Sequence, residues 1–430
     1  MKKLDNIWFE KVPSNWSIKK IKYVTKLRNE KSRELSDLIY LGLENIEPHT
    51  GKYFVDSNIE QNVEGTSNRF YKGDVLFGKL RPYLTKCIES DFDGICTTEL
   101  LVIKCEENKI KSAYLKYLLL SPKFIDEVNS STYGAQMPRA NWEFIKNIEI
   151  PLPDLESQKK IIKYIQSKEQ SIETLLKNKG KLIKLLEEKR QSIITEGVTK
   201  GLNTKVKMRD SGVEQIGEIP EHWTKTRLDF ISSVKARLGW KALKAEEYVD
   251  RGYILLATPN LKFHDIDFDN VNYITEERYI ESPEIMLKEG DVLLAKDGST
   301  LGITNVVRRL PVAATVNSSI AVLRLKKEMN SIYFYYYLKS QYIQDTINQI
   351  KDGMGVPHLF QADIKKFNVL LPPIDEQILI GRFLDEEILK LDNLIKSIKD
   401  QIQKLKEYRQ SLIYEAVTGK IDVRELIAEK

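Results

Sequence analysis

The sequence of 430 residues is poor in cysteine and contains no long hydrophobic run. Its cysteines, Cys87, Cys96 and Cys105, lie nine residues apart, a spacing that fits neither the CxxC pairs of a zinc site nor a disulfide framework. We therefore expect reduced, packed cysteines and a cytoplasmic protein. No apolar run approaches the roughly 18 residues that a membrane-spanning helix needs, so we expect no membrane partner.

Motifs of several enzyme classes are also missing. There is no GxxxxGK[ST] phosphate loop, which argues against ATP hydrolysis by this chain. An adenine methyltransferase would need a glycine-rich cofactor loop and an Asn/Asp-Pro-Pro-aromatic motif, but Pro372-Pro373 stands between Leu371 and Ile374. The histidines are scattered, without the spacing of a metal site: His49, His222, His264 and His358. We expect no catalytic residue, no metal and no cofactor in this chain.

What the sequence does contain is an internal repeat, which has to be found before any fold is assigned. Residues 12–16 (VPSNW) return as 219–223 (IPEHW), and residues 72–76 (KGDVL) return as 289–293 (EGDVL). A Gly-Pro segment follows at 133–138 and again at 352–357. A Leu-Pro joint then precedes Gln158 in the first copy and Gln377 in the second. Both copies end on similar sequences, RQSII from Arg190 and RQSLI from Arg409.

The distance between matching residues changes along the repeat. It is 207 residues from Val12 to Ile219 and 217 from Lys72 to Glu289, and it stays at 219 from Tyr133 and Asp352 to the end. Insertions therefore fall in the first part of each copy, and the last part keeps a fixed register. The chain predicts two variable domains on a constant frame.

The constant part of each copy predicts a long helix. Residues 156–199 contain no proline, and in both copies apolar residues recur every seven positions, with Lys179 as the interruption in the first. Seven-residue spacing over several heptads is typical of a coiled coil, although an ordinary helix packed on its own domain is the alternative. A segment of about 40 residues would span roughly 60 Å. The residues that we expect to pair the helices are Ile165, Ile172, Leu186, Ile193, Leu384, Leu391, Ile398, Leu405 and Leu412. In the second helix, the apolar stripe is widened by a flanking row: Ile388, Ile395 and Ile402.

The variable parts predict mixed α/β domains. Buried strands are expected at residues 74–77, 100–103, 291–295 and 320–325, and helices at 113–120 and 333–338. Because a two-fold axis perpendicular to a helix reverses its direction, the repeat predicts pseudo-two-fold symmetry. The expected fold is thus α+β, with two such domains joined by an antiparallel intramolecular coiled coil. The expected boundaries are a first domain at 1–152, a helix at 153–200, a linker at 201–219, a second domain at 220–371, and a helix and tail at 372–430.

Two globular domains on paired helices suit a protein that binds two sites at a fixed separation. The net charge of +5 is compatible with DNA as the partner. The segment at 78–86 places cations and an aromatic residue on one proline-kinked loop, where phosphates and base edges could be contacted. The matching loop at 295–300 is more polar, and the Gly-Pro segments bring further polar residues. The candidate DNA-binding residues of the first domain are Lys79, Arg81, Tyr83, Lys86, Arg139 and Asn141. Those of the second are Arg237, Trp240, Lys241, Lys244, Lys296, Ser299, His358 and Gln361.

This pattern resembles the specificity subunits of type I restriction–modification systems over nearly the whole chain. The resemblance is carried by the Pro-x-x-Trp openings at 13–16 and 220–223, the Leu-Pro joints with Gln158 and Gln377, and the Arg-Gln-Ser helix ends. Segments 237–244 and 297–302 are also similar to segments of target-recognition domains. Lys179 and the richer basic loop of the first domain depart modestly from the pattern.

The resemblance implies a DNA-recognition subunit without catalysis of its own. Each target-recognition domain would contact one half of a bipartite DNA site, and the helices would set the spacer and bind two modification subunits. Those subunits would carry S-adenosylmethionine and methylate adenine at N6. Two added restriction subunits would translocate and cut unmodified double-stranded DNA with ATP and magnesium.

Two other functions stay open on the residues alone. The chain could be a coiled-coil adaptor that holds two protein partners through its globular domains. It could also be a single-chain methyltransferase or nuclease whose site matches no known motif. A steep loss of DNA affinity with rising salt would distinguish a DNA-binding protein from an adaptor.

Overall fold

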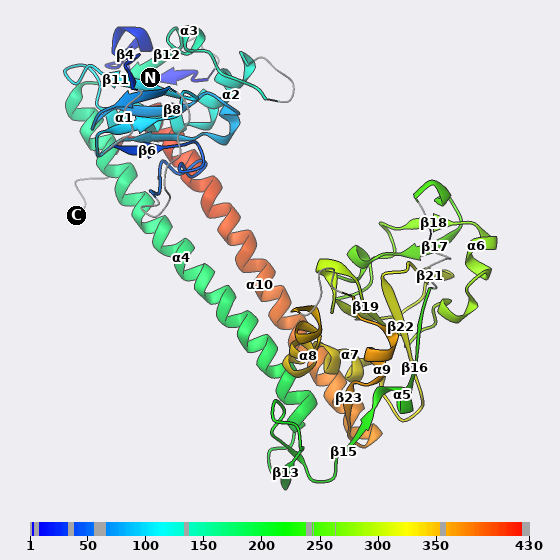
Figure 1. Ribbon diagram of the computed structural model, residues 1–430. Coiled ribbons are helices and arrows are strands. Elements are labelled where there is room, and N and C mark those ends of the chain that lie inside the picture. Colours follow the sequence, from blue (N-terminus) through cyan, green and yellow to red (C-terminus); the bar gives the residue numbers. More distant parts are fainter. Residues whose placement is uncertain are drawn as a thin grey trace. The chain divides into compact units, whose positions relative to one another are not determined.

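The computed structural model describes residues 2–3, 8–32, 38–55, 66–132, 137–237, 243, 245–262, 264–352 and 358–423. It divides the chain into two compact units (Figure 1). Unit 1 contains Met1–Gly180 and Lys399–Lys430, and unit 2 contains Lys181–Ile398. Each variable domain therefore belongs to one unit, and each long helix contributes residues to both.

Unit 1 holds the first variable domain, which is built on a central and an outer sheet. The central sheet has the order β4-β11-β8-β9, with bounds Thr25–Leu27, Leu100–Cys105, Val75–Gly78 and Cys87–Glu89. The outer sheet has the order β5-β7-β10-β6, with bounds Lys31–Ser32, Ser67–Phe70, Gly94–Cys96 and Ile39–Leu41. Two separate antiparallel strand pairs complete the domain: β3 (Ser17–Lys20) with β12 (Glu149–Leu152), and β1 (Lys2–Lys3) with β2 (Lys11–Val12).

Unit 2 repeats this plan with a smaller outer sheet. Its central sheet has the order β16-β22-β19-β20, with bounds Ser232–Ala236, Ile320–Leu325, Val292–Ala295 and Thr304–Val306. The outer sheet has the order β18-β17-β21, with bounds Asn272–Ile274, Tyr253–Leu256 and Ala314–Val316. β15 (Thr224–Arg227) pairs with β23 (Asn368–Leu371) as β3 does with β12. The domains differ most in the outer sheet, where the spacing of the repeat also changes.

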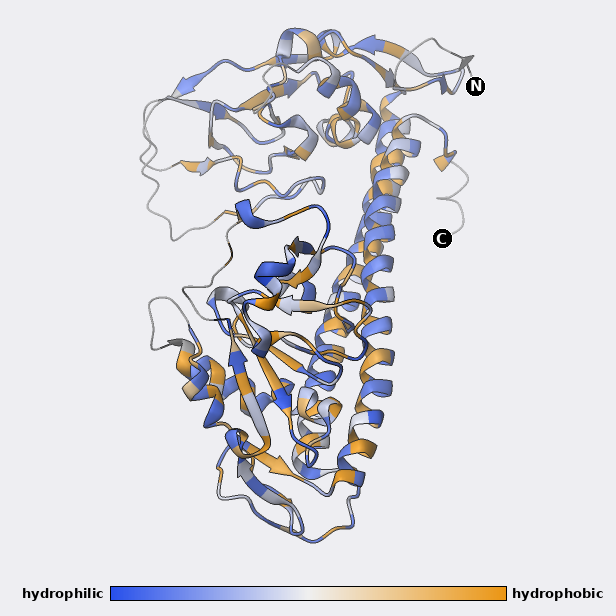
Figure 2. Cartoon of the chain, turned by 90° about the vertical axis from the view of Figure 1, so that its right-hand side faces the viewer, coloured by the Kyte–Doolittle hydropathy of each residue, from blue (hydrophilic) through white to orange (hydrophobic). Residues whose placement is uncertain are grey.

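The central strands are apolar on both faces because they are covered on both. In β8, Val75 and Phe77 belong to the core that contains the helices, and Leu76 belongs to the core beneath the outer sheet. In β19, Val292 and Leu293 divide between two cores in the same way. Figure 2 shows hydrophobic residues concentrated in these strands. The predicted strands at 74–77, 100–103, 291–295 and 320–325 are thus confirmed as β8, β11, β19 and β22.

Short helices cover the inner face of each central sheet. They are α1 (Ser112–Leu120), α2 (Pro122–Ser130) and α3 (Trp142–Ile145) in the first domain, and α7 (Ser331–Lys339), α8 (Gln341–Asp352) and α9 (Gln361–Lys365) in the second. The second domain adds α5 (Leu228–Ile231) and α6 (Glu276–Ile280). The helices predicted at 113–120 and 333–338 are confirmed as α1 and α7. Single 3-10 turns connect the elements: Ile21–Tyr23, Pro82–Leu84, Ala245–Glu247, Thr258–Leu261, Pro283–Ile285 and Gly298–Thr300.

The segment expected to be a plain linker has structure of its own. β13 (Met208–Asp210) pairs with β14 (Glu218–Pro220), and Ser211 and Ile216 between them are buried. Gly212 and Gly217 both have a φ of 70°, which lets the chain turn there at little steric cost. The polar composition concealed this short hairpin.

The long helices are α4 (Leu155–Lys200, 46 residues) and α10 (Ile374–Val417, 44 residues). In unit 1, Ile165 shares a core with Leu412, and further along α4 the Lys179 Nζ donates to Gln401 Oε1 at 2.5 Å. In unit 2, Arg190 Nη1 lies 2.6 Å from Asp392 Oδ1. As the residue number increases along α4, the residue that it contacts in α10 has a lower number. The helices are therefore antiparallel in each unit. Among the described residues, no helix is long and apolar enough to cross a membrane.

The residues expected to pair the helices are not buried to the same degree. The buried ones are Ile165, Ile172, Leu384, Leu391, Ile398 and Leu412, and the half-buried ones are Leu186, Ile193 and Leu405. Ile388 and Ile395 of the flanking row are buried, and Ile402 is half-buried. Ile194 and Val198 are more deeply buried than Ile193, because the second domain covers α4 on a further side there.

A buried glutamine fastens each variable domain to the start of its helix. Gln158 Oε1 accepts a hydrogen bond from Lys111 N (2.8 Å), and its Nε2 donates to the oxygens of Lys109 and Pro153, both at 2.9 Å. Gln377 makes the same set in the second repeat, with Asn330 N (2.8 Å) and the oxygens of Glu328 (3.0 Å) and Pro372 (2.8 Å). An amide both donates and accepts, so one side chain satisfies three backbone groups at the joint.

A buried tyrosine joins each domain to the end of the other long helix. The Tyr114 hydroxyl lies 3.1 Å from the carbonyl oxygens of both Pro151 and Val417. The Tyr333 hydroxyl lies 3.2 Å from the oxygens of both Leu370 and Val198. The first domain therefore contacts the last turn of α10, and the second contacts the last turns of α4.

The glutamine network predicts a large, position-specific loss of stability. Gln158→Ala removes the partner of the buried Pro153 carbonyl and of two partly buried groups, the Lys111 N–H and the Lys109 carbonyl, and a buried group without a partner costs about 1–3 kcal/mol. We expect the free energy of unfolding in urea to fall by at least about 2 kcal/mol. Gln170→Ala, on the exposed face of α4, is the control and should leave it nearly unchanged. Equal stability of the two variants would show that the network contributes nothing.

Candidate nucleic-acid interface

The loop at 78–86 and the segment at 137–141 form one structure in the first domain. Arg81 N donates to Pro138 O (2.8 Å), Ala140 N donates to Lys79 O (2.9 Å), and a β-bridge joins Leu80 to Arg139. The predicted residues Lys79, Arg81 and Arg139, which are far apart in the sequence, are thereby brought together.

The second domain contains the same backbone frame. Leu359 N donates to Lys296 O (2.8 Å), and a β-bridge joins Asp297 to His358. Each domain has one further equivalent hydrogen bond. Lys79 N donates to Glu99 O in the first domain, and Lys296 N donates to Ser319 O in the second. We call these two structures the paired loops. They have matching backbones and different side chains.

The paired loops of the first domain present cations and an aromatic ring. Arg81 is exposed, Lys79 is half-buried, and the Tyr83 side chain is 47% exposed. Arg139 is exposed as well, but it forms an ion pair with Glu99, with Nε 3.2 Å from Oε2. Arg81 has a φ of 50° and a ψ of 61°, a left-handed conformation that costs an L-residue roughly 1–2 kcal/mol.

Two predicted residues of this loop region have roles inside the domain. Lys86 Nζ donates to the carbonyl oxygen of Leu43 at 2.6 Å, and the side chain is half-buried. Asn141 is the N-cap of α3, where its Oδ1 accepts from Glu143 N at 2.9 Å. Both side chains stabilise the loop that presents their neighbours, so their part in DNA binding stays a prediction with less support.

The paired loops of the second domain are less basic at the surface. Lys296 is buried, with its Nζ 3.4 Å from Asp297 Oδ2, and Asp297 also holds His358 through Nδ1. Ser299 is exposed, and Gln361 is half-buried at the start of α9. Phe360, which the sequence did not single out, is exposed with its ring 4.5 Å from that of His358. The surface offers hydrogen-bonding and aromatic groups with little free charge.

Arg237 does not have the surface position expected of it, and its part in DNA binding stays a prediction. Its side chain is only 3% exposed, and its Nε donates to Val316 O at 3.4 Å inside the domain. Burial, followed by the neighbouring charge of Arg278, lowers the pKa of this guanidinium. The basic composition of residues 237–244 suggested a surface segment, but the residue directly after β16 points inward. Trp240, Lys241 and Lys244 lie outside the described residues.

A buried aspartate holds the turn before the central strand in each domain. Asp74 accepts from Arg28 Nε (2.8 Å) and Tyr71 N (2.9 Å). Asp291 accepts from Arg324 Nε and Lys288 N, both at 2.8 Å. The aspartate raises the pKa of its arginine through these hydrogen bonds. The repeated Gly-Asp motif marks the aspartates, but the arginines come from different strands, so sequence comparison does not reveal the pairs.

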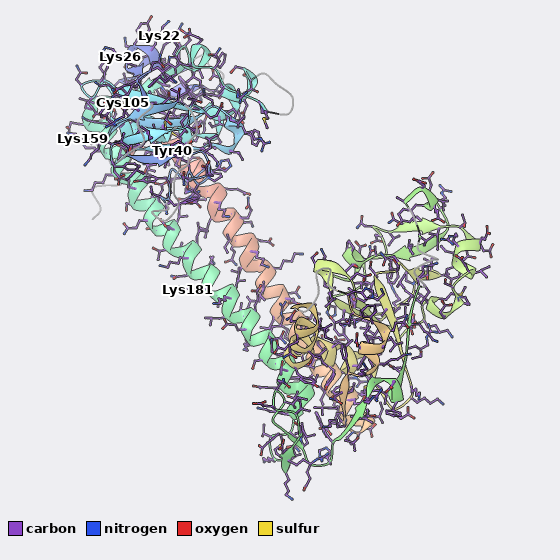
Figure 3. The ribbon with its side chains drawn as sticks, in the orientation of Figure 1. Lys22, Lys26, Tyr40, Cys105, Lys159 and Lys181 are labelled. Atoms are coloured by element: carbon purple, nitrogen blue, oxygen red, sulfur yellow. The ribbon has the colours of Figure 1, made fainter. Side chains whose placement is uncertain are left out.

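An exposed aromatic residue also recurs, and the sequence analysis missed it. Tyr23 is 57% exposed and Phe230, 207 residues later, is 64% exposed. In both, a lysine holds the backbone: Lys109 Nζ donates to Tyr23 O, and Lys326 Nζ donates to Phe230 O. Around Tyr23, Lys22 and Lys26 extend from the surface of unit 1 (Figure 3). Aligning the two copies at this offset could have identified the pair.

The cysteines have no role at this surface. Cys87, Cys96 and Cys105 are free and buried. Burial raises the pKa of Cys96 and of Cys105 to about 12, so these thiols stay protonated at neutral pH. Within the described ranges, no cluster of His, Cys, Asp and Glu could hold a metal ion.

Comparison with known proteins identifies the family. The model of the type I restriction modification DNA specificity domain matches residues 13–185 and again 220–407. The chain belongs to this family. The two matches correspond to the two copies of the repeat, each with its variable domain and its long helix, so the family assignment covers the paired loops of both domains.

Similar proteins include two from Methanocaldococcus jannaschii. The type I restriction enzyme MjaVIII specificity subunit is 26% identical over 341 residues, which cover 77% of this chain and 76% of that protein. The MjaIX specificity subunit is 23% identical over 432 residues, covering 97% and 96%.

Solved structures share the fold. A chain from a study of the assembly and conformational transition of the type I R-M system has a TM-score of 0.77 at 20% identity, covering 96% of this chain and all of that one (100%). The HsdS subunit from Thermoanaerobacter tengcongensis has a TM-score of 0.55 at 19% identity, covering 96% and 98%. The predicted pair of mixed α/β domains with antiparallel helices is thus confirmed.

The ion pair in the first paired loops generates a testable prediction. Glu99→Gln keeps the shape of the side chain but removes the charge that holds Arg139, so one more cation faces a DNA backbone. Affinity for DNA should rise, and the slope of log affinity against log salt should steepen by about 1, as expected for one added phosphate contact. Glu187→Gln, on the exposed face of α4, changes the net charge equally and should leave the slope unaltered. An unchanged slope in Glu99→Gln would remove Arg139 from the interface.

Proposed function

We propose that this chain is the DNA-recognition subunit of a type I restriction–modification complex and that each variable domain binds one half of an asymmetric, bipartite site. The observation that carries the proposal is the pair of loops with matching backbones and different side chains. A shared frame presents both surfaces in equivalent ways. The different side chains give each surface its own base preference.

The first domain is suited to a charge-dependent contact, because its loops expose Arg81, Tyr83 and half-buried Lys79. Cations of this kind bind phosphates and guanine edges. The second domain is suited to contacts through Ser299, His358 and Gln361, which can hydrogen-bond to several bases. Different half-sites therefore follow from the side chains present.

The long helices have a second role in the proposal, which is to set the spacer and to bind two modification subunits. Support comes from apolar side chains that α4 and α10 leave exposed, since large apolar residues exposed on a helix mark protein contacts. They are Leu175, Leu182, Leu185, Leu379, Phe383, Leu389 and Leu394. S-adenosylmethionine would act on the modification subunits, and ATP and magnesium on two restriction subunits, in the cytoplasm. The chain itself would contribute recognition and no chemical step.

The proposed function is tested by a methylome. The chain is co-expressed with its modification subunit in a host free of adenine methylation, and N6-methyladenine is mapped by sequencing. We expect a split, asymmetric motif with an unread gap of fixed length. A chimera with residues 1–152 exchanged for those of a relative should change one half-site and leave the other intact.

Two results would contradict the proposal. One is a stable, correctly assembled complex that methylates no defined sequence, which would favour the adaptor function. The other is a chimera in which both half-sites change together, which would exclude one half-site per domain.

If the long helices bind the modification subunits, substitutions on their exposed apolar residues should weaken that binding selectively. Leu182→Glu combined with Leu185→Glu places two carboxylates on an apolar surface of α4, and we expect binding of the modification subunit to weaken at least tenfold. Lys181→Glu is the control, because Lys181 is exposed on the same turn of α4 and contributes no apolar side chain. Affinity is measured by titrating labelled modification subunit. Equal affinities for the double variant and the control would place the binding surface elsewhere.

A further inference from the structure

Arg81 differs from the other arginines that the structure describes in the first variable domain. Arg28 is held by Asp74, Arg69 lies over the ring of Tyr71 at 5.3 Å, and Arg139 pairs with Glu99. The Arg81 side chain is exposed and has no hydrogen bond or ion pair among the described residues. Its planar fork of N–H donors is therefore available to a ligand.

The backbone holds Arg81 firmly in place. Arg81 N donates to Pro138 O at 2.8 Å, Leu84 N donates to Arg81 O at 2.9 Å, and the next residue is Pro82 at the start of a 3-10 turn. The residue has left-handed dihedrals although it has a side chain and precedes a proline, which both disfavour that conformation. Strain of this kind persists where the surroundings over-determine a residue, and it concentrates at functional positions.

The second domain provides an internal comparison. Gly298, 217 residues after Arg81, occupies the matching place in the paired loops with a φ of 61°. A Cβ added there would meet nothing within 4 Å. Both domains thus keep the left-handed turn, and space for a side chain exists in both. The difference at this position is the guanidinium itself.

A contact with phosphate alone does not require the strained and fixed backbone of Arg81. Phosphates accept hydrogen bonds from mobile cations in many orientations, and Lys79 beside Arg81 can supply such a contact. Bidentate recognition of a base edge needs a donor pair at a set position and angle. Guanine, with its O6 and N7 acceptors in the major groove, is the base that matches arginine in this way.

We propose that Arg81 is a specificity-determining residue that recognises a guanine in the half-site bound by the first domain. The inference rests on the proposed function and adds the residue and the base that it selects. In the second half-site no guanine is selected from this position, because Gly298 has no side chain.

The test uses the complex of full-length chain and modification subunit, with the half-sites assigned by the chimera described above. Binding is measured to DNA duplexes in which each base pair of the first half-site is replaced in turn. For the wild-type chain, replacing one guanine should weaken binding by about 5- to 150-fold, the range expected for a bidentate arginine–guanine pair. Arg81→Gly should bind all bases at that position within about twofold, Arg81→Lys should discriminate less than the wild type, and preferences in the second half-site should not change.

Arg81→Lys separates base recognition from charge. Lysine keeps the positive charge but lacks the rigid planar fork that fits O6 and N7 together, so salt dependence should be preserved while discrimination is weakened. Arg81→Gly also removes the backbone strain, and its thermal stability should equal or exceed that of the wild type. A loss of discrimination in this variant therefore cannot be due to unfolding.

The reciprocal variant is Gly298→Arg, which installs the guanidinium on the matching turn of the second domain. We expect a new preference for guanine at one position of the second half-site and no change in the first.

Each of three results would overturn the inference: a first half-site without guanine on either strand, full discrimination retained by Arg81→Lys, or an equal loss of affinity for all sequences in Arg81→Gly. Failure of the proposed function is distinct, because the wild-type complex would then bind every duplex equally. If the wild type discriminates between duplexes but the Arg81 variants discriminate equally well, the proposed function is supported and the role of Arg81 is excluded.

Discussion

The structure of each repeat depends on the hydrogen bonding of one buried amide. At the joint between a variable domain and its long helix, the chain leaves a strand through a Leu-Pro step, and three backbone groups, one buried and two partly buried, are bonded there by a side chain. Gln158 and Gln377 satisfy them with their donors and acceptors. An ester, a carboxylate or an apolar side chain of the same size could not do so. The two networks are the same in both repeats, and they lie in the part of the chain where the spacing of the repeat is constant at 219 residues.

The constant joint leaves the rest of the domain free to vary. The outer sheets differ in strand number, and the buried aspartates of the central sheets use arginines from different strands, yet the paired loops keep the same backbone. Variation is thus confined to regions that do not carry the attachment to the helices. A recognition protein of this kind can change its side chains at the loops without altering how the loops are presented.

Much of the fold was predictable because its signals are local or repeated. The central strands are apolar runs after a Gly-Asp turn, and the long helices have a seven-residue period without proline. The site was less predictable. Arg237 lies in a basic segment but points into the core, and Lys86 and Asn141 act on nearby backbone groups that only the folded chain brings within reach. Tyr23 and Phe230 were missed because exposure of an aromatic residue has no signature within one copy, and only an alignment of the two copies at an offset of 207 residues pairs them. Boundaries at 152 and 219 depend on contacts across the joint, and they stay predictions.

The contact between Tyr114 and the last turn of α10 has a consequence for the order in which the protein folds. The core of the first domain includes Ile165 of α4 but also Leu412 and Val417, which lie 247 and 252 residues further along the chain. At a synthesis rate of about 5–20 residues per second, the ribosome needs roughly 12–50 s to pass from Ile165 to Leu412. During that time the nascent first domain has an uncovered apolar face. The second domain, whose core uses α4 residues made before it, can complete itself first. The domain that is translated earlier is therefore the one that finishes folding later.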